Sequence, residues 1–156
     1  MKVLVTGSTG YIGHQLALEL ASKGHEVHAL VRNLKSEAIP KHANIKMFEG
    51  DVCDMNSIKL AMKNCKMVFH TAAFTNLQCK KIDNFYNVNV IGTKNMLEAA
   101  FQNKIKRFIY TSTLSVFGPS YKSVAITESQ PRLASFMNDY ELTKSKSEET
   151  DLSYKK

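Results

Sequence analysis

The stretch that decides the fold reads Thr6-Gly7-Ser8-Thr9-Gly10-Tyr11-Ile12-Gly13 and directly follows the apolar run Val3-Leu4-Val5. An apolar strand that ends in three glycines, spaced three residues apart, and continues as an amphipathic helix predicts a tight turn whose backbone N–H groups face a pyrophosphate. We expect Gly7 to permit the turn, Gly10 to let the main chain approach the phosphates, and Gly13 to let the helix pack close to the strand. The spacing is GxxGxxG rather than the usual GxGxxG, and a purely structural turn without a ligand is the alternative.

Composition bounds the remaining possibilities. The chain has 156 residues, of which 44% are apolar and 22% charged, so we expect one globular domain over residues 1–156. The formal charge of +7 comes from basic residues spread along the chain. A phosphorylated cofactor accounts for its sign as well as nucleic acid does, and since no nucleic-acid-binding motif occurs, we expect no such partner.

The cysteines and the hydropathy pattern indicate the compartment. Cys53, Cys65 and Cys79 are odd in number and lack CxxC spacing, so we expect reduced thiols and no metal site. No stretch approaches the roughly 18 apolar residues of a membrane span, and the N-terminus does not resemble a signal peptide. These features predict a soluble, cytoplasmic protein without a membrane partner.

Strand and helix patterns alternate along the chain. A first helix is predicted from Ile12 to a C-terminal Gly24, a second after Asp54 or Asn56, and the longest carries Phe85, Asn89, Gly92, Met96 and Ala100 on one stripe. Further strands are expected at 26–32, 45–48, 67–70 and 108–110. Because parallel strands need crossover connections, this alternation predicts an α/β fold, a Rossmann-type doubly wound parallel sheet of order 3-2-1-4-5. Such a sheet binds its ligand at the carboxyl ends of the strands.

A long irregular segment and a final helix follow the fifth strand. Residues 114–138 contain scattered proline, glycine and polar residues, and we expect a binding loop over the site. In the helix that begins near Asn138 or Asp139, Tyr140 and Lys144 are i and i+4 and share a face. An ammonium one turn from a phenol favours the phenolate, so Tyr140 is a candidate general acid or base and Lys144 its electrostatic support. The alternative is an incidental pair on a partly exposed helix.

Together with other motifs, these residues resemble the extended branch of the short-chain dehydrogenase/reductase family, also called NAD-dependent epimerase/dehydratases. The resemblance follows the chain in order. It rests on 6–13, Gly50-Asp51-Val52, Val68-Phe69-His70-Thr71-Ala72-Ala73, Asn87-Val88-Asn89-Val90-Ile91-Gly92-Thr93, Tyr110-Thr111-Ser112-Thr113-Leu114-Ser115-Val116-Phe117-Gly118 and Tyr140 to Lys144.

The resemblance implies a role for each candidate residue. The glycine turn binds the cofactor, Asp51 and Val52 hold its adenine, and Ala72 and Ala73 line its ribose. Asn89 contacts the cofactor, Thr113 orients the substrate, Tyr140 transfers the proton, and Lys144 also binds the nicotinamide ribose. The cofactor-binding set is therefore Gly7, Thr9, Gly10, Tyr11, Ile12, Gly13, Arg32, Asp51, Val52, Ala72, Ala73, Asn89 and Lys144. From the residues alone, Asn89 is a core amide, His70 a satisfied core histidine, and Thr113 a hydroxyl that makes a turn bond.

Cofactor choice and subclass depend on fewer residues. NAD enzymes usually carry an acidic residue at the end of the second strand, whereas this chain has Arg32, with Lys35 nearby. A guanidinium suits a 2′-phosphate, so we expect NADP, with NAD possible and a solvated charge as the alternative. Leu114-Ser115 replaces the acidic pair of nucleotide-sugar dehydratases, and the sequence at 25–27 and 31–32 resembles dihydroflavonol reductases and hydroxysteroid dehydrogenases.

The expected function is therefore reduction of a ketone or aldehyde by NADPH, with Tyr140 as proton donor. A nucleotide-sugar epimerase or dehydratase is the alternative, and a truncated, non-catalytic dinucleotide-binding module is another. Family members continue past the tyrosine helix into a lobe that supplies most substrate contacts, whereas this chain ends at Lys156. We therefore expect the C-terminal substrate lobe to be absent, 107–111 to form an apolar edge, and the chain to form a homo-oligomer.

Overall fold

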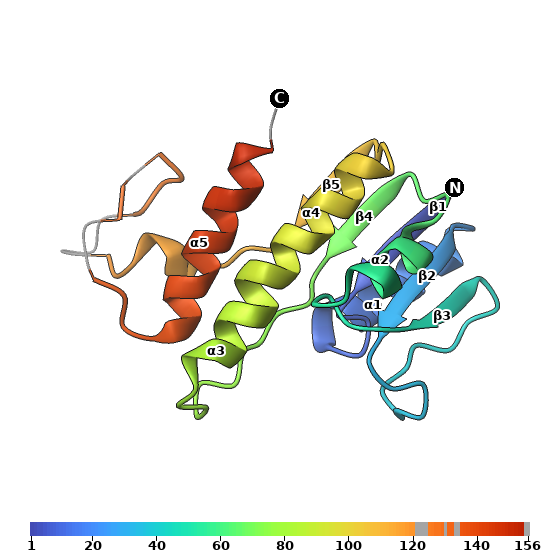
Figure 1. Cartoon of the computed structure of the whole chain (residues 1–156), viewed down its shortest axis with the longest axis horizontal. Coiled ribbons are helices and arrows are strands. Elements are labelled where there is room, and N and C mark those ends of the chain that lie inside the picture. Colours follow the sequence, from blue (N-terminus) through green and yellow to red (C-terminus); the bar gives the residue numbers. More distant parts are fainter. Residues whose placement is uncertain (121–124, 130, 133–134, 155–156) are drawn as a thin grey trace.

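The centre of the molecule is a parallel sheet that confirms the predicted strand order. The computed structural model describes residues 1–120, 125–129, 131–132 and 135–154. Within them, five strands are arranged as β3-β2-β1-β4-β5, and every neighbouring pair is parallel (Figure 1). The strands are β1 (Lys2–Thr6), β2 (Glu26–Val31), β3 (Ile45–Glu49), β4 (Met67–His70) and β5 (Arg107–Tyr110).

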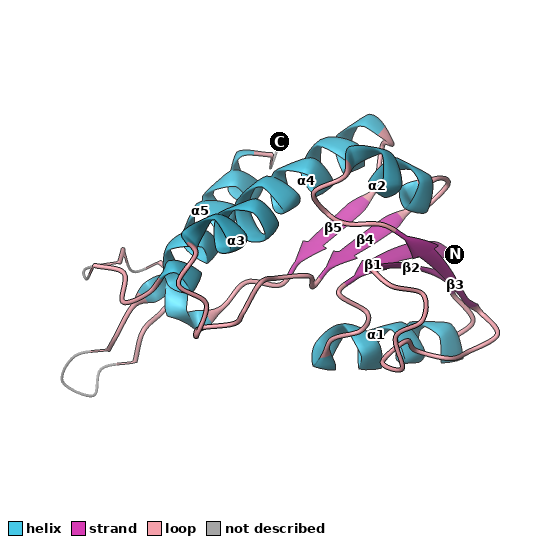
Figure 2. Cartoon of the chain, turned by 60° about the horizontal axis from the view of Figure 1, so that its bottom comes forward, coloured by secondary structure: helices cyan, strands magenta, loops and turns pink. Residues whose placement is uncertain are grey.

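Helices cover both faces of this sheet, as the crossover argument predicts. Helix α1 (Tyr11–Ser22) lies on one face, and α2 (Met55–Met62) and α4 (Gly92–Gln102) lie on the other (Figure 2). Successive β1 side chains point to opposite faces, so Val3 and Val5 join the core under α1 while Leu4 joins the core under α2 and α4. Burial on both faces explains the continuous apolar run of a central parallel strand.

The longest predicted helix contains a register change. Its parts are α3 (Ile82–Phe85), a π-helical segment η1 (Tyr86–Ile91) and α4. The predicted stripe is buried at Phe85, Asn89, Gly92, Met96 and Ala100. A π-helical turn widens the helix locally, and within it the carbonyl of Asn89 accepts a hydrogen bond from Ser147 Oγ at 2.6 Å. The residue pattern predicted the buried face, but not the wider turn.

The other boundaries need small corrections. Strand β2 ends at Val31, so Arg32 lies just beyond it, and Gly24 follows α1 with a φ of 80°. The expected loop 114–138 contains a 3-10 helix, η2 (Leu114–Phe117), because the Thr113 hydroxyl caps it by accepting from Ser115 N. Residues 121–124, 130 and 133–134 of that loop lie outside the described residues. Helix α5 (Asp139–Ser153) begins after an Asn138 cap, as predicted.

Strand β5 lies at one edge of the sheet. Phe108, Ile109 and Tyr110 are half-buried there, and Arg107 is exposed. Helix α5 lies alongside η1 and α4 and does not cover the strands of the sheet (Figure 1). No helix among the described residues is long and apolar enough to cross a membrane.

Candidate functional site

The glycine turn fits closely against the carboxyl end of β4. Gly7 has a φ of 72°, and a Cβ there would lie 2.7 Å from the backbone nitrogen of Ala72. A Cβ on Gly13 would contact the carbonyl of Gly7 and lie 2.6 Å from Thr71 Oγ1. Real Cβ atoms do not approach so closely, so glycine is required at both positions for this turn to lie against β4.

A pocket of about 400 Å³ lies at the carboxyl ends of the strands. This is where a parallel doubly wound sheet binds its ligand. The structure brings eight of the predicted cofactor-binding residues together in its lining: Gly7, Thr9, Gly10, Arg32, Asp51, Val52, Ala72 and Ala73.

Gly10 lines this pocket at the start of α1. It is the N-cap of α1, no side chain caps the helix there, and a Cβ added at Gly10 would meet only the Gly7 carbonyl, at 3.2 Å. The first N–H groups of a helix lack partners within the helix and attract anions. Gly10 N itself donates to Gly7 O at 2.9 Å, so an anion would bind at the N–H groups of the first turn of α1 that follows Gly10. Tyr11, with 90% of its surface exposed, and the exposed Ile12 are not part of the pocket lining.

The segment after β3 forms another wall. Asp51 Oδ1 accepts from Cys53 N at 2.8 Å, and Asp51 N donates to Ser57 Oγ at 3.2 Å, which fixes this turn beside the buried Val52. Burial, together with the Asp51 carboxylate, raises the pKa of the Cys53 thiol to about 11. Cys53 is therefore a neutral thiol at pH 7. None of the three cysteines forms a disulfide.

Asn89 lies behind the pocket and not in its lining. Its side chain is 1% exposed and joins two segments. Oδ1 accepts from Phe74 N at 2.7 Å, and Nδ2 donates to Phe74 O at 3.2 Å and to Thr143 Oγ1 at 3.0 Å. Phe74 lines the pocket, so Asn89 connects the pocket wall to α5.

His70 is a satisfied core histidine in the structure. Its Nδ1 is hydrogen-bonded to Thr6 Oγ1 at 2.7 Å and its Nε2 to Thr93 Oγ1 at 3.0 Å. Complete burial, with a smaller effect of Lys144, lowers the pKa of His70 to about 3. A ring that stays neutral and has both nitrogens occupied is not available for proton transfer.

Lys144 extends from α5 to the end of β5. The side chain is buried, Nζ donates to Thr111 O at 2.7 Å, and Nζ lies 4.1 Å from the centroid of the Tyr110 ring. Burial lowers the pKa of Lys144 to about 8, which leaves it mostly charged at pH 7. The structure thus holds a positive charge at the carboxyl end of the edge strand.

Two phenols belong to this region, and the structure distinguishes them. Tyr110 carries a buried hydroxyl, and burial raises the pKa of Tyr110 well above its ordinary value. Tyr140 is half-buried in the first turn of α5, on the same helix face as Lys144.

Thr113 uses its hydroxyl as the cap of η2, accepting from Ser115 N at 3.3 Å. Tyr140, Lys144 and Thr113 do not line the pocket.

Sequence reasoning missed several pocket residues. Thr71 donates from Oγ1 to Thr6 O at 2.7 Å and lines the pocket, as do Phe74, Thr75 and Asn76. The place of Thr71 in the lining could have been predicted, because residues at the carboxyl ends of strands border the ligand site in such folds. The position of residues 74–76 depends on the Asn89 hydrogen bonds, which no local pattern reveals.

Comparison with known proteins identifies the family. The model of the 3-beta hydroxysteroid dehydrogenase/isomerase family matches residues 4–153. The chain belongs to this family, one of the extended short-chain dehydrogenases/reductases. The resemblance inferred from the motifs is confirmed.

Relatives of this family are considerably longer than the chain. "Sterol demethylase protein B" of Methylococcus capsulatus is 29% identical over 95% of the chain and 45% of its own length. "3-beta-hydroxysteroid dehydrogenase" of Mycolicibacterium neoaurum is 32% identical over 92% of the chain and 40% of its own length. The chain therefore spans less than half the length of these curated relatives.

In the solved structures too, the chain matches only about half of the longer protein. WbmH of Bordetella bronchiseptica in complex with NAD+ superimposes with a TM-score of 0.88 at 25% identity, over 99% of this chain and 52% of that one. MoeE5 in complex with UDP-glucose and NAD gives a TM-score of 0.84 at 28% identity, over 99% of this chain and 49% of that one. The fold described here is that of the first half of such proteins.

Substituting Asn89 by leucine tests the connection between the pocket wall and α5. The variant removes the side-chain partner of Phe74 N and Phe74 O and the hydrogen bond to Thr143 Oγ1, so we expect a loss on the order of 3 kcal/mol in the free energy of unfolding, measured by urea denaturation. Asn95→Leu is the control, because it makes the same change in α4 but removes one hydrogen bond, from Nδ2 to Val52 O at 3.2 Å. Equal losses in both variants would contradict the connection.

Proposed function

We propose that the chain is the dinucleotide-binding part of an NADP(H)-dependent oxidoreductase that reduces a ketone or an aldehyde. The observation that supports it most is the pocket, whose lining combines the glycine turn with the segments after β2, β3 and β4. Membership of a dehydrogenase family adds weight to a redox reaction.

The residues of the pocket fit an extended dinucleotide. The N–H groups at the glycine turn and the α1 N-terminus would bind the pyrophosphate. Asp51 and Val52 would hold the adenine, and Ala72 and Ala73 would line a ribose. Arg32 is exposed at the end of β2, where a guanidinium can pair with a 2′-phosphate, and this position supports NADP over NAD.

Residues of this chain would donate the proton that the reduction requires. When bound, NADPH would supply a hydride for the carbonyl carbon. Tyr140 would donate its hydroxyl proton to the carbonyl oxygen, and the charged Lys144 would stabilise the phenolate that remains. Tyr110 is unsuited to this role, because the same burial that raises its pKa opposes loss of its proton. Thr113 would orient the substrate, and Lys144 would also bind the nicotinamide ribose.

A second candidate is a nucleotide-sugar epimerase or dehydratase. It is favoured by the match to MoeE5, whose structure contains UDP-glucose and NAD. It would use the same dinucleotide pocket, so the two candidates differ in substrate and in the net redox change.

Two further features complete the proposal. Three cysteines without disulfides are typical of a reducing compartment, so we place the protein in the cytoplasm. The edge strand β5 supports self-association into a homo-oligomer, because an edge strand presents unpaired backbone groups to a second copy.

Arg32→Asp tests the cofactor preference. The substitution replaces attraction to a 2′-phosphate by repulsion, so we expect NADPH affinity to fall about tenfold to a hundredfold and NADH affinity to stay within about twofold, measured by calorimetry. Lys94→Asp makes the same charge change on the exposed surface of α4 and should leave both affinities unchanged. A wild-type chain that binds both cofactors equally would refute the preference.

Tyr140→Phe tests the proton donor. Removing the hydroxyl should lower kcat by a factor of about 10² to 10⁴ with little change in NADPH affinity, followed as NADPH oxidation with a panel of ketones, aldehydes and nucleotide sugars. Tyr154→Phe is the matched control, because it removes a hydroxyl from the other end of α5, where the group donates to Glu98 Oε2 at 3.2 Å. Near-normal turnover in the Tyr140 variant would exclude it as the donor.

A further inference from the structure

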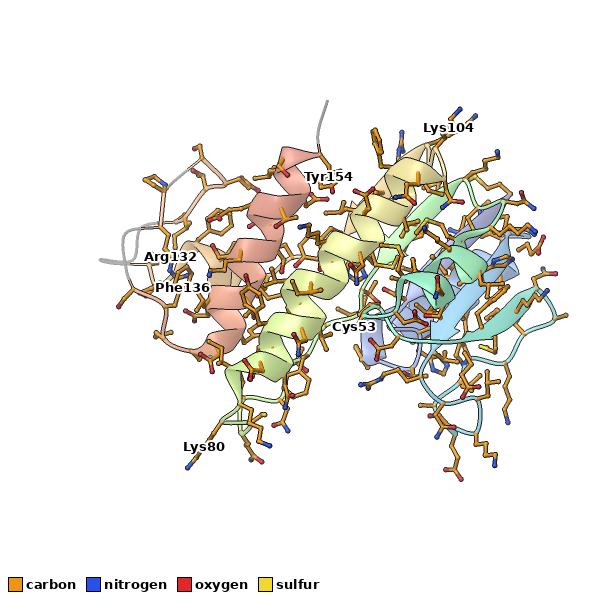
Figure 3. The ribbon with its side chains drawn as sticks, viewed as in Figure 1. Cys53, Lys80, Lys104, Arg132, Phe136 and Tyr154 are labelled. Atoms are coloured by element: carbon orange, nitrogen blue, oxygen red, sulfur yellow. The ribbon has the colours of Figure 1, made fainter. Side chains whose placement is uncertain are left out.

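Arg132 joins two segments that are far apart in the sequence. Its Nη1 donates to the backbone oxygens of Ser115 and Val116, the latter at 3.1 Å. Its Nη2 donates to Ser135 O at 3.1 Å and to Glu141 Oε2 at 2.6 Å. The guanidinium also lies over the ring of Phe136, 4.2 Å from its centroid, and Figure 3 shows both side chains next to α5.

Glu141 is fixed by the first turn of α5. Its own N–H donates to the side chain of the N-cap Asn138 at 2.9 Å. Its Oε2 accepts from Met137 N at 3.1 Å as well as from Arg132. The side chain is buried, and a buried carboxylate depends on partners of this kind. The Arg132 guanidinium and the backbone N–H of Met137 therefore donate to the same oxygen atom of Glu141.

The two ends of this connection are next to proposed active-site residues. Ser115 and Val116 belong to η2, whose N-cap is Thr113. Glu141 directly follows Tyr140 in α5. A planar guanidinium that binds both segments with several hydrogen bonds fixes their relative position more narrowly than an ammonium can.

We propose that the Arg132–Glu141 pair positions two residues of the proposed active site. It holds η2 against the first turn of α5 and so fixes the position of Thr113 relative to Tyr140. The pair acts through other residues and is not itself catalytic. The inference rests on the proposed function for its effect on turnover, but not for its effect on structure. Nothing in the sequence around Arg132, in an irregular segment, indicates this role.

Hydrogen exchange of the 156-residue chain tests the structural part. Arg132→Met should raise amide exchange in 114–117 and 139–142 by about tenfold and leave β1 and β2 unchanged, because Arg132 holds the first two segments together. Arg132→Lys should give an intermediate increase. Arg107→Met is the control, since it removes an exposed arginine at the start of β5. Unchanged exchange in both segments of the Arg132→Met variant would overturn the proposal.

Kinetics test the functional part. Misplacing a reacting group by a small distance lowers the rate of the chemical step, so Arg132→Met should lower kcat by about tenfold or more while calorimetric NADPH affinity stays unchanged, and Arg132→Lys should restore part of the rate. A fall in NADPH affinity equal to the fall in kcat would overturn positioning. If the wild-type chain oxidises NADPH with no substrate of the panel, the proposed function fails, and hydrogen exchange still decides the role of the pair.

Discussion

The close approach of the glycine turn to the end of β4 is the constraint on which the site depends. Gly7 and Gly13 leave no room for a Cβ against Ala72 and Thr71, so the turn and the segment that follows β4 border the same pocket. Without this approach the N-terminus of α1 would move away from the strand ends. The N–H groups of a helix end attract an anion only within a short distance, so the proposed phosphate site requires glycine at both positions.

Helix α5 is held at the site by polar contacts. Its buried residues are Glu141, Thr143, Lys144 and Ser147, and each makes a hydrogen bond to another element: to Arg132, Asn89 or Thr111. Such contacts have strict geometry, whereas apolar packing tolerates sliding. A helix that carries the proposed proton donor is therefore fixed in position, although it contributes little to the apolar core.

The sequence predicts what local periodicity and topology determine. The alternation of strand and helix patterns was enough for the sheet order, and the glycine spacing for the lining around Gly10, because the carboxyl ends of parallel strands share one edge. The place of Asp51 in the lining was implied by the family resemblance. The π-helical segment around Asn89 and the contacts of Arg132 with η2 depend on tertiary partners 15 to 58 residues away and leave no local pattern. The roles of Asn89 and His70 as buried, fully bonded side chains were among the alternatives that the residues alone suggested.

Titration calorimetry with NADPH tests the central claim most directly. The claim is that the glycine turn, open at Gly10, binds the phosphates of a dinucleotide. The account predicts that the wild-type chain binds NADPH, and that Gly10→Val abolishes binding while thermal unfolding remains cooperative, because the added side chain occupies the path of the phosphates. A variant that binds NADPH as tightly as the wild type, or a wild-type chain that binds neither NADPH nor NADH, would contradict it.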